Sequence, residues 1–185
     1  FDTVGRSCPN VDIKILSNKR FLKNNIIGEI VCRTPLKFIG YLNSSKLTKK
    51  SFFNEYFKTG DLGFLDNDNF LHFIGRKKNM IIVSGTNVYP EDIEKVLLDL
   101  KYIKECCVIA KKDDKFGEAI FAIIRSNKKR NEIITNIKKH CLDNLSDFQL
   151  PRYFGFIHQF PKSPLGKIKR KEVEILATNI RTYEL

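Results

Sequence analysis

Six polar residues that could bind a ligand or take part in catalysis are concentrated in one stretch, 56–94. In this stretch such side chains alternate with apolar runs. We therefore expect them to stand at strand ends and turns, where binding and catalytic groups are usually placed. The six residues are Thr59, Asp61, Arg76, Lys78, Ser84 and Asn87.

The first of these groups is Thr59-Gly60-Asp61, a carboxylate next to a glycine. One carboxylate can accept hydrogen bonds from the two adjacent hydroxyls of a ribose. The run Asp66-Asn67-Asp68-Asn69 predicts a turn that pairs strands 60–65 and 70–74 as a hairpin. Arg76 at the hairpin end could then reach Asp61 and contact a phosphate or the ribose. A turn-stabilising aspartate, or a plain salt bridge between the two, fits the sequence as well.

Two glycine-containing loops are further candidates. Ser84-Gly85-Thr86-Asn87 could let a ligand pass close to the backbone, or could be a tight turn into a helix. In 163–167, Lys167 follows a glycine, but the full G-x-x-x-x-G-K-[ST] pattern is missing. This segment is therefore no nucleotide P-loop, and a lone Gly-Lys is typical of exposed charge.

The composition indicates a folded globular protein with no strong bias towards one class of partner. The chain has 185 residues, 42% of them hydrophobic, and a formal net charge of +12. The basic residues are spread along the chain, which favours a solvated surface over a nucleic-acid footprint. The five cysteines show no CxxC and no pairing with histidine at ligand spacing. We expect buried thiols in a reducing, cytoplasmic compartment, no zinc, no targeting segment and no transmembrane segment.

The order of apolar patterns predicts the α+β class. Strands are expected at 11–16 and 28–33 as an antiparallel pair, and again at 80–83, 106–110, 118–125 and 154–160. Helices are expected from Pro90, at 131–145 and at 168–180. The turn 111–117 should join two of the strands. The polar run 75–79 between two apolar strands predicts a domain boundary at Lys78.

Four motifs together resemble one known superfamily. They are VGRSCPNVDIKI, GEIVCRTP, the stretch from YFKTGD to YPEDIE, and FPKSPLGKIKRKEV, in this order. Their order and spacing resemble the C-terminal third of the adenylate-forming enzymes, which include acyl-CoA synthetases, luciferases and peptide-synthetase adenylation domains. The resemblance implies that 1–77 is the β-rich end of the large N-terminal domain. It implies that 78–185 is a small α+β domain that rotates, with a sheet of about three strands flanked by helices.

The resemblance also implies an activity. Such enzymes convert an acid and ATP to an acyl-adenylate and pyrophosphate, and CoA then attacks the adenylate to give acyl-CoA and AMP. The motifs look most like those of medium- to long-chain fatty acyl-CoA ligases, with the fatty acyl-AMP ligases as an alternative. A non-catalytic basic binding module remains as an alternative from another class. The cofactors and co-substrates implied are ATP, Mg²⁺ and CoA, with Mg²⁺ bound mainly by the N-terminal part of the same enzyme.

Roles follow by matching each residue to the family motifs. Asp61 would bind the ribose hydroxyls, Arg76 the ribose or phosphate, and Phe73 would line the nucleotide pocket. Lys167 would reach the carboxylate and the α-phosphate during adenylation, and Lys78 matches the hinge position. The channel for the pantetheine arm of CoA would be lined by Ser84, Gly85 and Asn87.

Several parts of the family's site are absent from this sequence. Its phosphate loop, adenine-binding segment and acyl pocket do not occur here, and no metal site is expected among these residues. We therefore expect the 185-residue chain to be a fragment that is inactive alone and that works with the N-terminal domain of the same enzyme.

Overall fold

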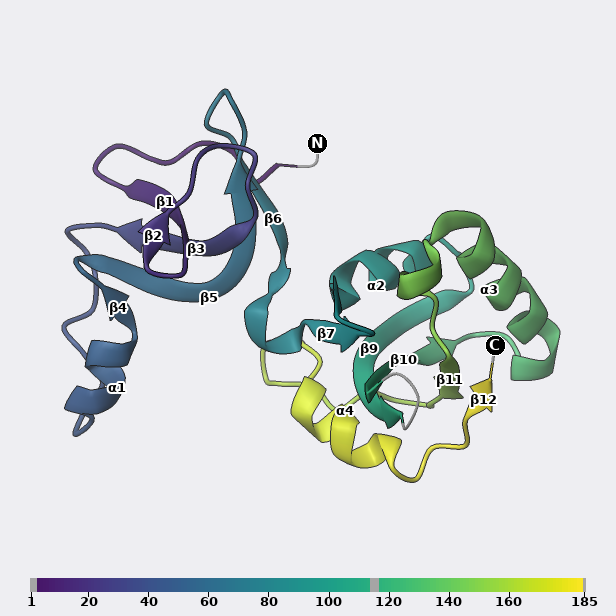
Figure 1. The fold of residues 1–185 in the computed structure, drawn as a ribbon. Coiled ribbons are helices and arrows are strands. Elements are labelled where there is room, and N and C mark those ends of the chain that lie inside the picture. Colours follow the sequence, from purple (N-terminus) through teal and green to yellow (C-terminus); the bar gives the residue numbers. More distant parts are fainter. Residues whose placement is uncertain (1–2, 114–116, 185) are drawn as a thin grey trace. The chain divides into compact units, whose positions relative to one another are not determined.

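The computed structural model describes residues 3–113 and 117–184, which form two compact units, Phe1–Lys78 and Asn79–Leu185 (Figure 1). The division lies one residue from the predicted boundary between 1–77 and 78–185. The second unit combines helices with mostly antiparallel strands, and the predicted α+β class is confirmed.

The first unit is built on one antiparallel sheet. Its strand order is β2-β1-β3-β5-β4, and β6 also pairs with β5. The predicted pairing of 11–16 with 28–33 is present, since Ile15 lies opposite Ile30. The bounds are β1 (Asp12–Ser17), β2 (Arg20–Phe21), β3 (Gly28–Arg33), β4 (Phe52–Phe53), β5 (Tyr56–Leu65) and β6 (Leu71–Arg76).

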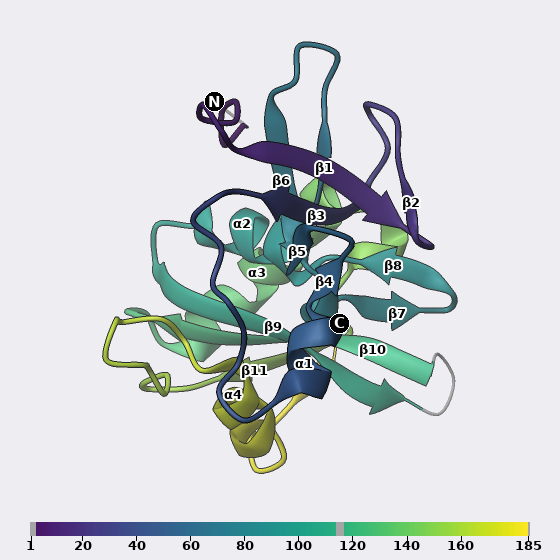
Figure 2. The ribbon, with the colours of Figure 1, turned by 90° about the vertical axis from the view of Figure 1, so that its left-hand side faces the viewer.

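A lysine-rich excursion leaves this sheet and returns to it. It contains a short helix, α1 (Ser45–Lys50) (Figure 2). The ring of Phe52 lies 5.6 Å from that of Phe38 and 5.7 Å from that of Phe57, measured between centroids. These aromatic contacts hold the excursion against the sheet.

The second unit has a mixed sheet with more strands than the three or so expected. The order is β12-β11-β10-β7-β8, with β9 on the other edge of β10. The additional strands are two or three residues long, too short to show an alternating pattern. The bounds are β7 (Ile81–Val83), β8 (Thr86–Val88), β9 (Ile103–Asp113), β10 (Gly117–Ser126), β11 (Tyr153–Phe156) and β12 (Tyr183–Glu184). Of the predicted turn 111–117, residues 111–113 continue β9 and 114–116 lie outside the described residues.

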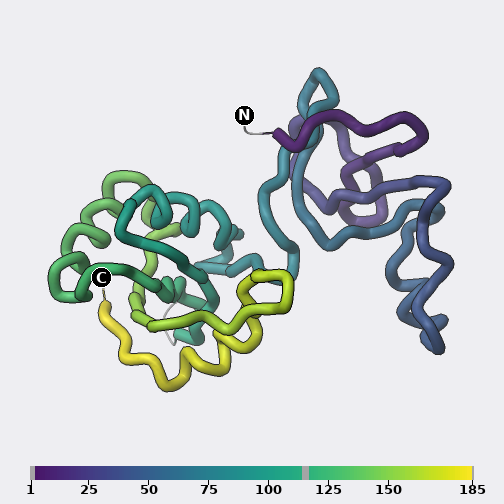
Figure 3. The backbone as a smooth tube through the Cα atoms, turned by 180° about the vertical axis from the view of Figure 1, so that it is seen from behind, coloured from purple at the N-terminus to yellow at the C-terminus, as the bar shows by residue number. Residues whose placement is uncertain are grey.

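Helices cover both faces of this sheet. Alternate residues of β10 point to opposite faces: Ile120 packs in the cluster with α2 (Pro90–Leu98) and α3 (Arg130–Asn144), and Phe121 packs in the cluster with α4 (Arg170–Ala177). Figures 1 and 3 show α2 and α3 on one side of the sheet and α4 on the other. The run of apolar residues in β10 reflects burial on both faces.

The cysteines are only partly as expected. Cys106, Cys107 and Cys141 are buried, and burial raises the pKa of Cys107 and of Cys141 to about 12. The prediction of buried thiols is wrong for Cys8, which is exposed, and incomplete for Cys32, which is partly exposed. Cys8 precedes a proline turn rather than lying in a strand.

Within 3–113 and 117–184, no helix is long and apolar enough to cross a membrane.

Candidate functional site

Asp61 and Arg76 lie directly opposite one another in the β5–β6 hairpin. Arg76 Nε is 2.7 Å from Asp61 Oδ1, and the side chains are 53% and 27% exposed, respectively. Phe73 lies opposite Gly63 on the same face and is half-exposed. An exposed cross-strand ion pair contributes only about 0.2–1 kcal/mol to stability. The structure therefore brings Asp61, Arg76 and Phe73 together on one face, accessible to a ligand.

The backbone at Thr59-Gly60 sets the position of Asp61. Gly60 has a φ of +76°, which glycine adopts without strain. Thr59 Oγ1 donates a hydrogen bond to the Ile30 carbonyl (2.8 Å) and accepts one from the Asp61 amide (3.1 Å). The strand pairing slips at this point, as in a β-bulge. The bulge therefore sets the direction in which the Asp61 side chain leaves the strand.

The alternative of a turn-stabilising Asp61 is not what the structure shows. The carboxylate that stabilises the hairpin turn is that of Asp66, whose Oδ1 accepts hydrogen bonds from the amides of Asp68 (3.0 Å) and Phe70 (2.9 Å). Its hydrogen bond with His72 lowers the pKa of Asp66. Within the described residues the Asp61 carboxylate has the ion pair with Arg76 and no hydrogen bond to the turn. Its second oxygen, Oδ2, can accept hydrogen bonds from a ligand.

Lys78 lies in the short 3₁₀ segment η1 (Lys77–Asn79). Lys77 Nζ lies 3.0 Å from Glu29 Oε2 in the first unit. Asn79 Nδ2 donates a hydrogen bond to Glu91 Oε1 (3.3 Å) in the second unit. The Lys78 side chain is exposed, with no hydrogen bond or ion pair to the residues described. Its neighbours are thus each tied to their own unit, and its role as a hinge stays a prediction.

Ser84 and Gly85 form a two-residue turn between β7 and β8. Their φ angles are +48° and +82°, and Val83 pairs with Thr86 across the turn. Positive φ at both central residues is the type I′ geometry that matches the twist of a hairpin. Of the two alternatives the tight turn is present, but it joins two strands rather than leading into the helix. Asn87 belongs to β8, and all three predicted channel residues are exposed.

Lys167 ends a second turn, which joins Lys162 to Ile168. The Ser163 amide donates to the Lys167 carbonyl (2.8 Å) and the Gly166 amide to the Ser163 carbonyl (2.9 Å). Gly166 has a φ of +77°. This is a hairpin-like turn and not the strand–loop–helix of a P-loop. The Lys167 side chain is exposed at its end.

Sequence reasoning missed Glu94 and Arg170, which form a partly buried ion pair. Arg170 Nη2 lies 2.8 Å from Glu94 Oε1, which also accepts a hydrogen bond from the Val108 amide (2.8 Å). Arg170 Nη1 donates to the Val108 carbonyl. Burial raises the pKa of Glu94, and Arg170 opposes this shift. A signal was available, because Glu94 adjoins the apolar stripe of Ile93 and Leu97, where a carboxylate needs a partner.

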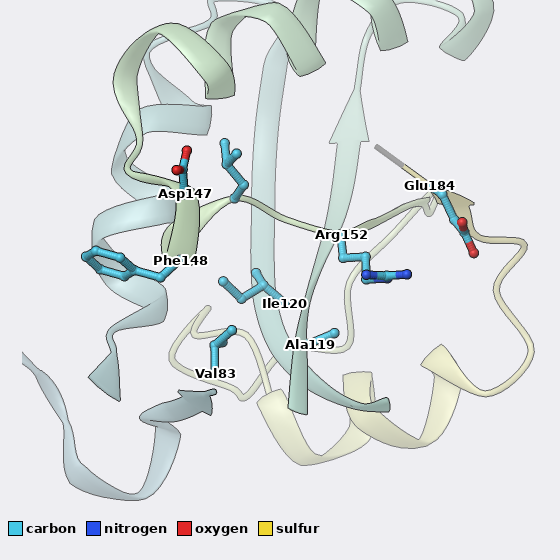
Figure 4. A pocket seen from close by; sticks show the side chains of 8 residues that line it. Val83, Ala119, Ile120, Asp147, Phe148, Arg152 and Glu184 are labelled. Atoms are coloured by element: carbon cyan, nitrogen blue, oxygen red, sulfur yellow. The ribbon is translucent and has the colours of Figure 1, made fainter. Parts of the chain in front are cut away.

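A cavity of about 330 Å³ opens beside β7 and β10 in the second unit (Figure 4). Its floor includes Ala119 and Ile120, and Figure 4 shows Phe148 on one side and Arg152 on the other. None of the residues predicted for the site lines it. The full lining is Val83, Ala119, Ile120, Asp147, Phe148, Leu150, Arg152 and Glu184.

The chain is similar to known proteins over most of its length. Residues 92–167 match the family of the AMP-binding enzyme C-terminal domain. A 2-succinylbenzoate–CoA ligase of Listeria monocytogenes is 36% identical over 147 residues, which are 80% of this chain and 31% of that protein. The long-chain-fatty-acid–CoA ligase FadD13 of Mycobacterium tuberculosis is 32% identical over 167 residues, 90% of this chain and 33% of that protein.

Among solved structures, the o-succinylbenzoate CoA synthetase MenE of Bacillus subtilis in complex with its acyl-adenylate intermediate matches with a TM-score of 0.88 and 28% identity. The match covers 94% of this chain and 35% of that chain. The chain belongs to the adenylate-forming enzymes. It spans about a third of the length of the relatives that it matches.

The candidate residues of the second unit do not meet in a single site. Figure 2 shows the β7–β8 hairpin and the loop leading to α4, which carries Lys167, on opposite sides of that unit. Within the residues described, no group of three or more His, Cys, Asp or Glu side chains could hold a metal ion.

Proposed function

We propose that the chain is the C-terminal part of an AMP-forming acyl-CoA synthetase. Residues 1–77 are the β-rich end of its large domain, and 78–185 are its rotating domain. One observation carries the proposal: the Asp61–Arg76 pair on the paired strands β5 and β6, and the exposed Lys167 on an ordered turn, belong to a fold that matches a CoA synthetase bound to its acyl-adenylate.

The reaction has two steps. The carboxylate of the acid attacks the α-phosphorus of ATP, and pyrophosphate leaves. The thiol of CoA then loses its proton and attacks the acyl carbon, the bond to the phosphate oxygen breaks, and AMP leaves. ATP and CoA are substrates, and the N-terminal domain of the same enzyme contributes most of the Mg²⁺ and triphosphate contacts.

The first unit supplies contacts to the nucleotide in both steps. When ionised, the Asp61 carboxylate accepts hydrogen bonds and donates none, and one carboxylate can accept from both ribose hydroxyls. The guanidinium of Arg76, held 2.7 Å from Asp61, presents further donors to the ribose or the phosphate. Half-exposed Phe73 adds an apolar surface on the same face. These three residues therefore bind and orient the nucleotide.

Lys167 serves the first step. Its ammonium offsets the charge that develops on the phosphorus and on the attacking carboxylate, an interaction that is strongest in the transition state. An exposed turn can deliver such a group into a site and withdraw it. We infer that rotation about Lys78 withdraws Lys167 before the thiol attacks.

The β7–β8 turn serves the second step. Its contribution is a stretch of backbone that no side chain covers at Gly85, where an added Cβ would meet no atom within 4 Å. Ser84, Gly85 and Asn87 then line the channel of the pantetheine arm.

The acid is a medium- or long-chain fatty acid in this proposal. FadD13 is a long-chain-fatty-acid–CoA ligase, whereas the Listeria relative is a 2-succinylbenzoate–CoA ligase. A test must therefore compare both acid classes. The compartment proposed is the cytoplasm, where thiols such as Cys106 and Cys107 remain reduced.

The experiment uses the full-length protein, with ATP–pyrophosphate exchange and acyl-CoA formation measured in parallel for octanoate, palmitate and o-succinylbenzoate. We expect exchange and thioester formation with a fatty acid. Exchange without thioester would identify an acyl-AMP ligase instead. No exchange with any acid would contradict the proposal, as would acid-dependent AMP and thioester formation by the purified 185-residue chain.

A non-catalytic basic module predicts a different result. The +12 net charge would then hold the protein on DNA or on anionic vesicles. Its signature is salt-dependent retention that neither nucleotide nor CoA changes.

A further inference from the structure

The turn that carries Lys167 has two legs, and each leg bears a cation held by a carboxylate of the underlying unit. We propose that the ion pairs Lys162–Glu105 and Arg170–Glu94 are positioning pairs, which fix the base of the turn so that Lys167 reaches the reacting phosphate. The proposal rests on the proposed function of Lys167 in adenylation.

The first leg is held by Glu105 of β9. Lys162 Nζ lies 2.5 Å from Glu105 Oε1, and Arg125 Nη1 lies 2.6 Å from Glu105 Oε2. Arg125 Nε also donates a hydrogen bond to the His158 carbonyl (3.0 Å), in the segment that leads into the turn. The Glu105 side chain is only 16% exposed. One carboxylate therefore joins the first leg of the turn to the edge strand of the sheet.

The second leg is held by Glu94 of α2. Arg170, three residues after Lys167, bonds with one nitrogen to Glu94 Oε1 and with another to the Val108 carbonyl. The Val108 amide donates to the same Glu94 oxygen. Both polar groups of Val108 on the outer edge of β9 are thus paired with side chains. Arg170 therefore fixes the first residue of α4 against both β9 and α2.

Between these anchors the turn is rigid and its end is free. The hydrogen bonds between Ser163 and Lys167 and the bridge from Lys162 to Ile168 set its shape. Phe160 and Val173, just outside the legs, are buried. Leu165 at the tip is 86% exposed. A displacement at the base would consequently move the whole turn as one body, and Lys167 with it.

Ion pairs at the base of this turn are better suited to positioning the turn than to stabilising the fold. Partly buried ion pairs contribute little more to stability than apolar side chains of similar size, and often less. They do impose a direction: the guanidinium of Arg170 bonds to Glu94 Oε1 and to the Val108 carbonyl at the same time, and Glu105 accepts from Lys162 and Arg125 through its two oxygens. A reacting group misplaced by about 1 Å can lose about 100-fold in rate. The pairs are thus suited to fixing the position of the Lys167 backbone, from which its long, flexible side chain extends.

The test measures both steps separately in the full-length enzyme, as acyl-AMP formation and as thioester formation from supplied acyl-AMP. For Glu105→Gln and for Lys162→Gln we expect kcat for acyl-AMP formation to fall by about 10- to 100-fold. Thioester formation and KM for ATP should stay within about twofold of the parent, since Lys167 is withdrawn in that step. The double variant should be no worse than Glu105→Gln alone, because Glu105→Gln already removes the pair with Lys162.

Glu172→Gln is the matched control. It makes the same chemical change in α4 and breaks the Lys169–Glu172 pair (2.8 Å), whose side chains are 44% and 49% exposed. It should leave both steps unchanged. Lys162→Arg, which keeps the cation, should retain acyl-AMP formation. Arg170→Gln tests the second leg and should show the same selective loss.

Three results would overturn the proposal. Unchanged acyl-AMP formation in Glu105→Gln and Lys162→Gln would do so, as would equal loss of both steps, which a purely structural role predicts. A failure of Lys162→Arg to rescue would count equally against it. Lys167→Ala is measured alongside: if it keeps acyl-AMP formation, the proposed function of Lys167 has failed, and if it alone loses that step, only the positioning pairs have failed. If Arg170→Gln does not fold, the proposal is judged on the variants of Lys162 and Glu105 alone.

Discussion

Two turns of the second unit each contain a glycine at positive φ but differ in their support. Gly85 and Gly166 both have positive φ, +82° and +77°, and an added Cβ at either would meet no atom within 4 Å. The Ser84–Gly85 turn is held by three residue pairs of a short ladder. The Lys167 turn is also held by ion pairs on both of its legs.

This difference corresponds to the role that we propose for each turn. A turn that lines a channel contributes its backbone path, and a type I′ hairpin defines that path with two residues. A turn that delivers a lysine must fix the origin of a side chain with four rotatable bonds, and hydrogen bonds within the turn do not fix its place on the unit. The four predictions that follow test this contrast, from the largest expected effect to the smallest.

The largest effect is expected at Arg170. The substitution Arg170→Met removes the cation that pairs with the Glu94 carboxylate. Burial already raises the pKa of Glu94, so the carboxylate is left without compensation for its burial. Breaking one partner from a buried pair costs about 3 kcal/mol of unfolding free energy. Urea unfolding of the 185-residue chain measures it. If the unfolding free energy falls by less than about 0.5 kcal/mol, this pair is no stronger than an ordinary surface ion pair. The Lys167 turn would then have no stronger support than the Ser84–Gly85 turn.

The two glycines provide a matched comparison. Gly85→Ala and Gly166→Ala should each cost about 1–2 kcal/mol, because both force an alanine into left-handed backbone. In the full-length enzyme Gly85→Ala should slow thioester formation selectively, and Gly166→Ala should slow acyl-AMP formation selectively. The half-reaction assays give both rates for each variant. If both variants slow the same step, the assignment of one turn to each step is wrong.

Lys78→Pro tests whether rotation of 78–185 about Lys78 switches the enzyme between the two half-reactions. Proline fixes φ, so the hinge should favour one arrangement, and one step should fall severalfold more than the other. Lys78→Ala, which leaves φ free, is the control. An equal loss of both steps would count against the hinge.

The smallest effect is expected in the dependence of stability on pH. The hydrogen bond with Lys162, followed by that with Arg125, holds the pKa of Glu105 below its usual value. A depressed pKa contributes stability above the unfolded-state value of about 4.3, and this contribution is lost as the pH falls through the folded-state value. The parent should therefore lose up to about 1 kcal/mol more than Glu105→Gln on acidification below about pH 4, since the partners are largely exposed. Parallel pH profiles would contradict this.

Local signals in the sequence predicted most elements of the fold. Asp66 and Asn69 marked the β5–β6 hairpin, and Pro90 marked the start of α2, because turn and cap residues act over a few positions. The strands β8 and β12 were missed, since three or two residues show no periodicity.

Contacts between distant residues could not be predicted in the same way. Arg170 and Glu94 are 76 positions apart, and only the packing of α4 beside β9 brings them together. Of the candidate site, the Asp61–Arg76 pair was predictable because a hairpin aligns its own ends. The roles of Lys78, Ser84, Asn87 and Lys167 depend on the resemblance and remain predictions.

The central claim is that Lys167 serves acyl-AMP formation and not thioester formation. The direct measurement compares Lys167→Ala with the parent full-length enzyme in the two separated half-reactions. We predict that acyl-AMP formation falls by about 100- to 1,000-fold, the usual loss when one group that stabilises transition-state charge is removed. Thioester formation from supplied acyl-AMP should remain within about twofold. Retained acyl-AMP formation, or an equal loss of both steps, would contradict the account.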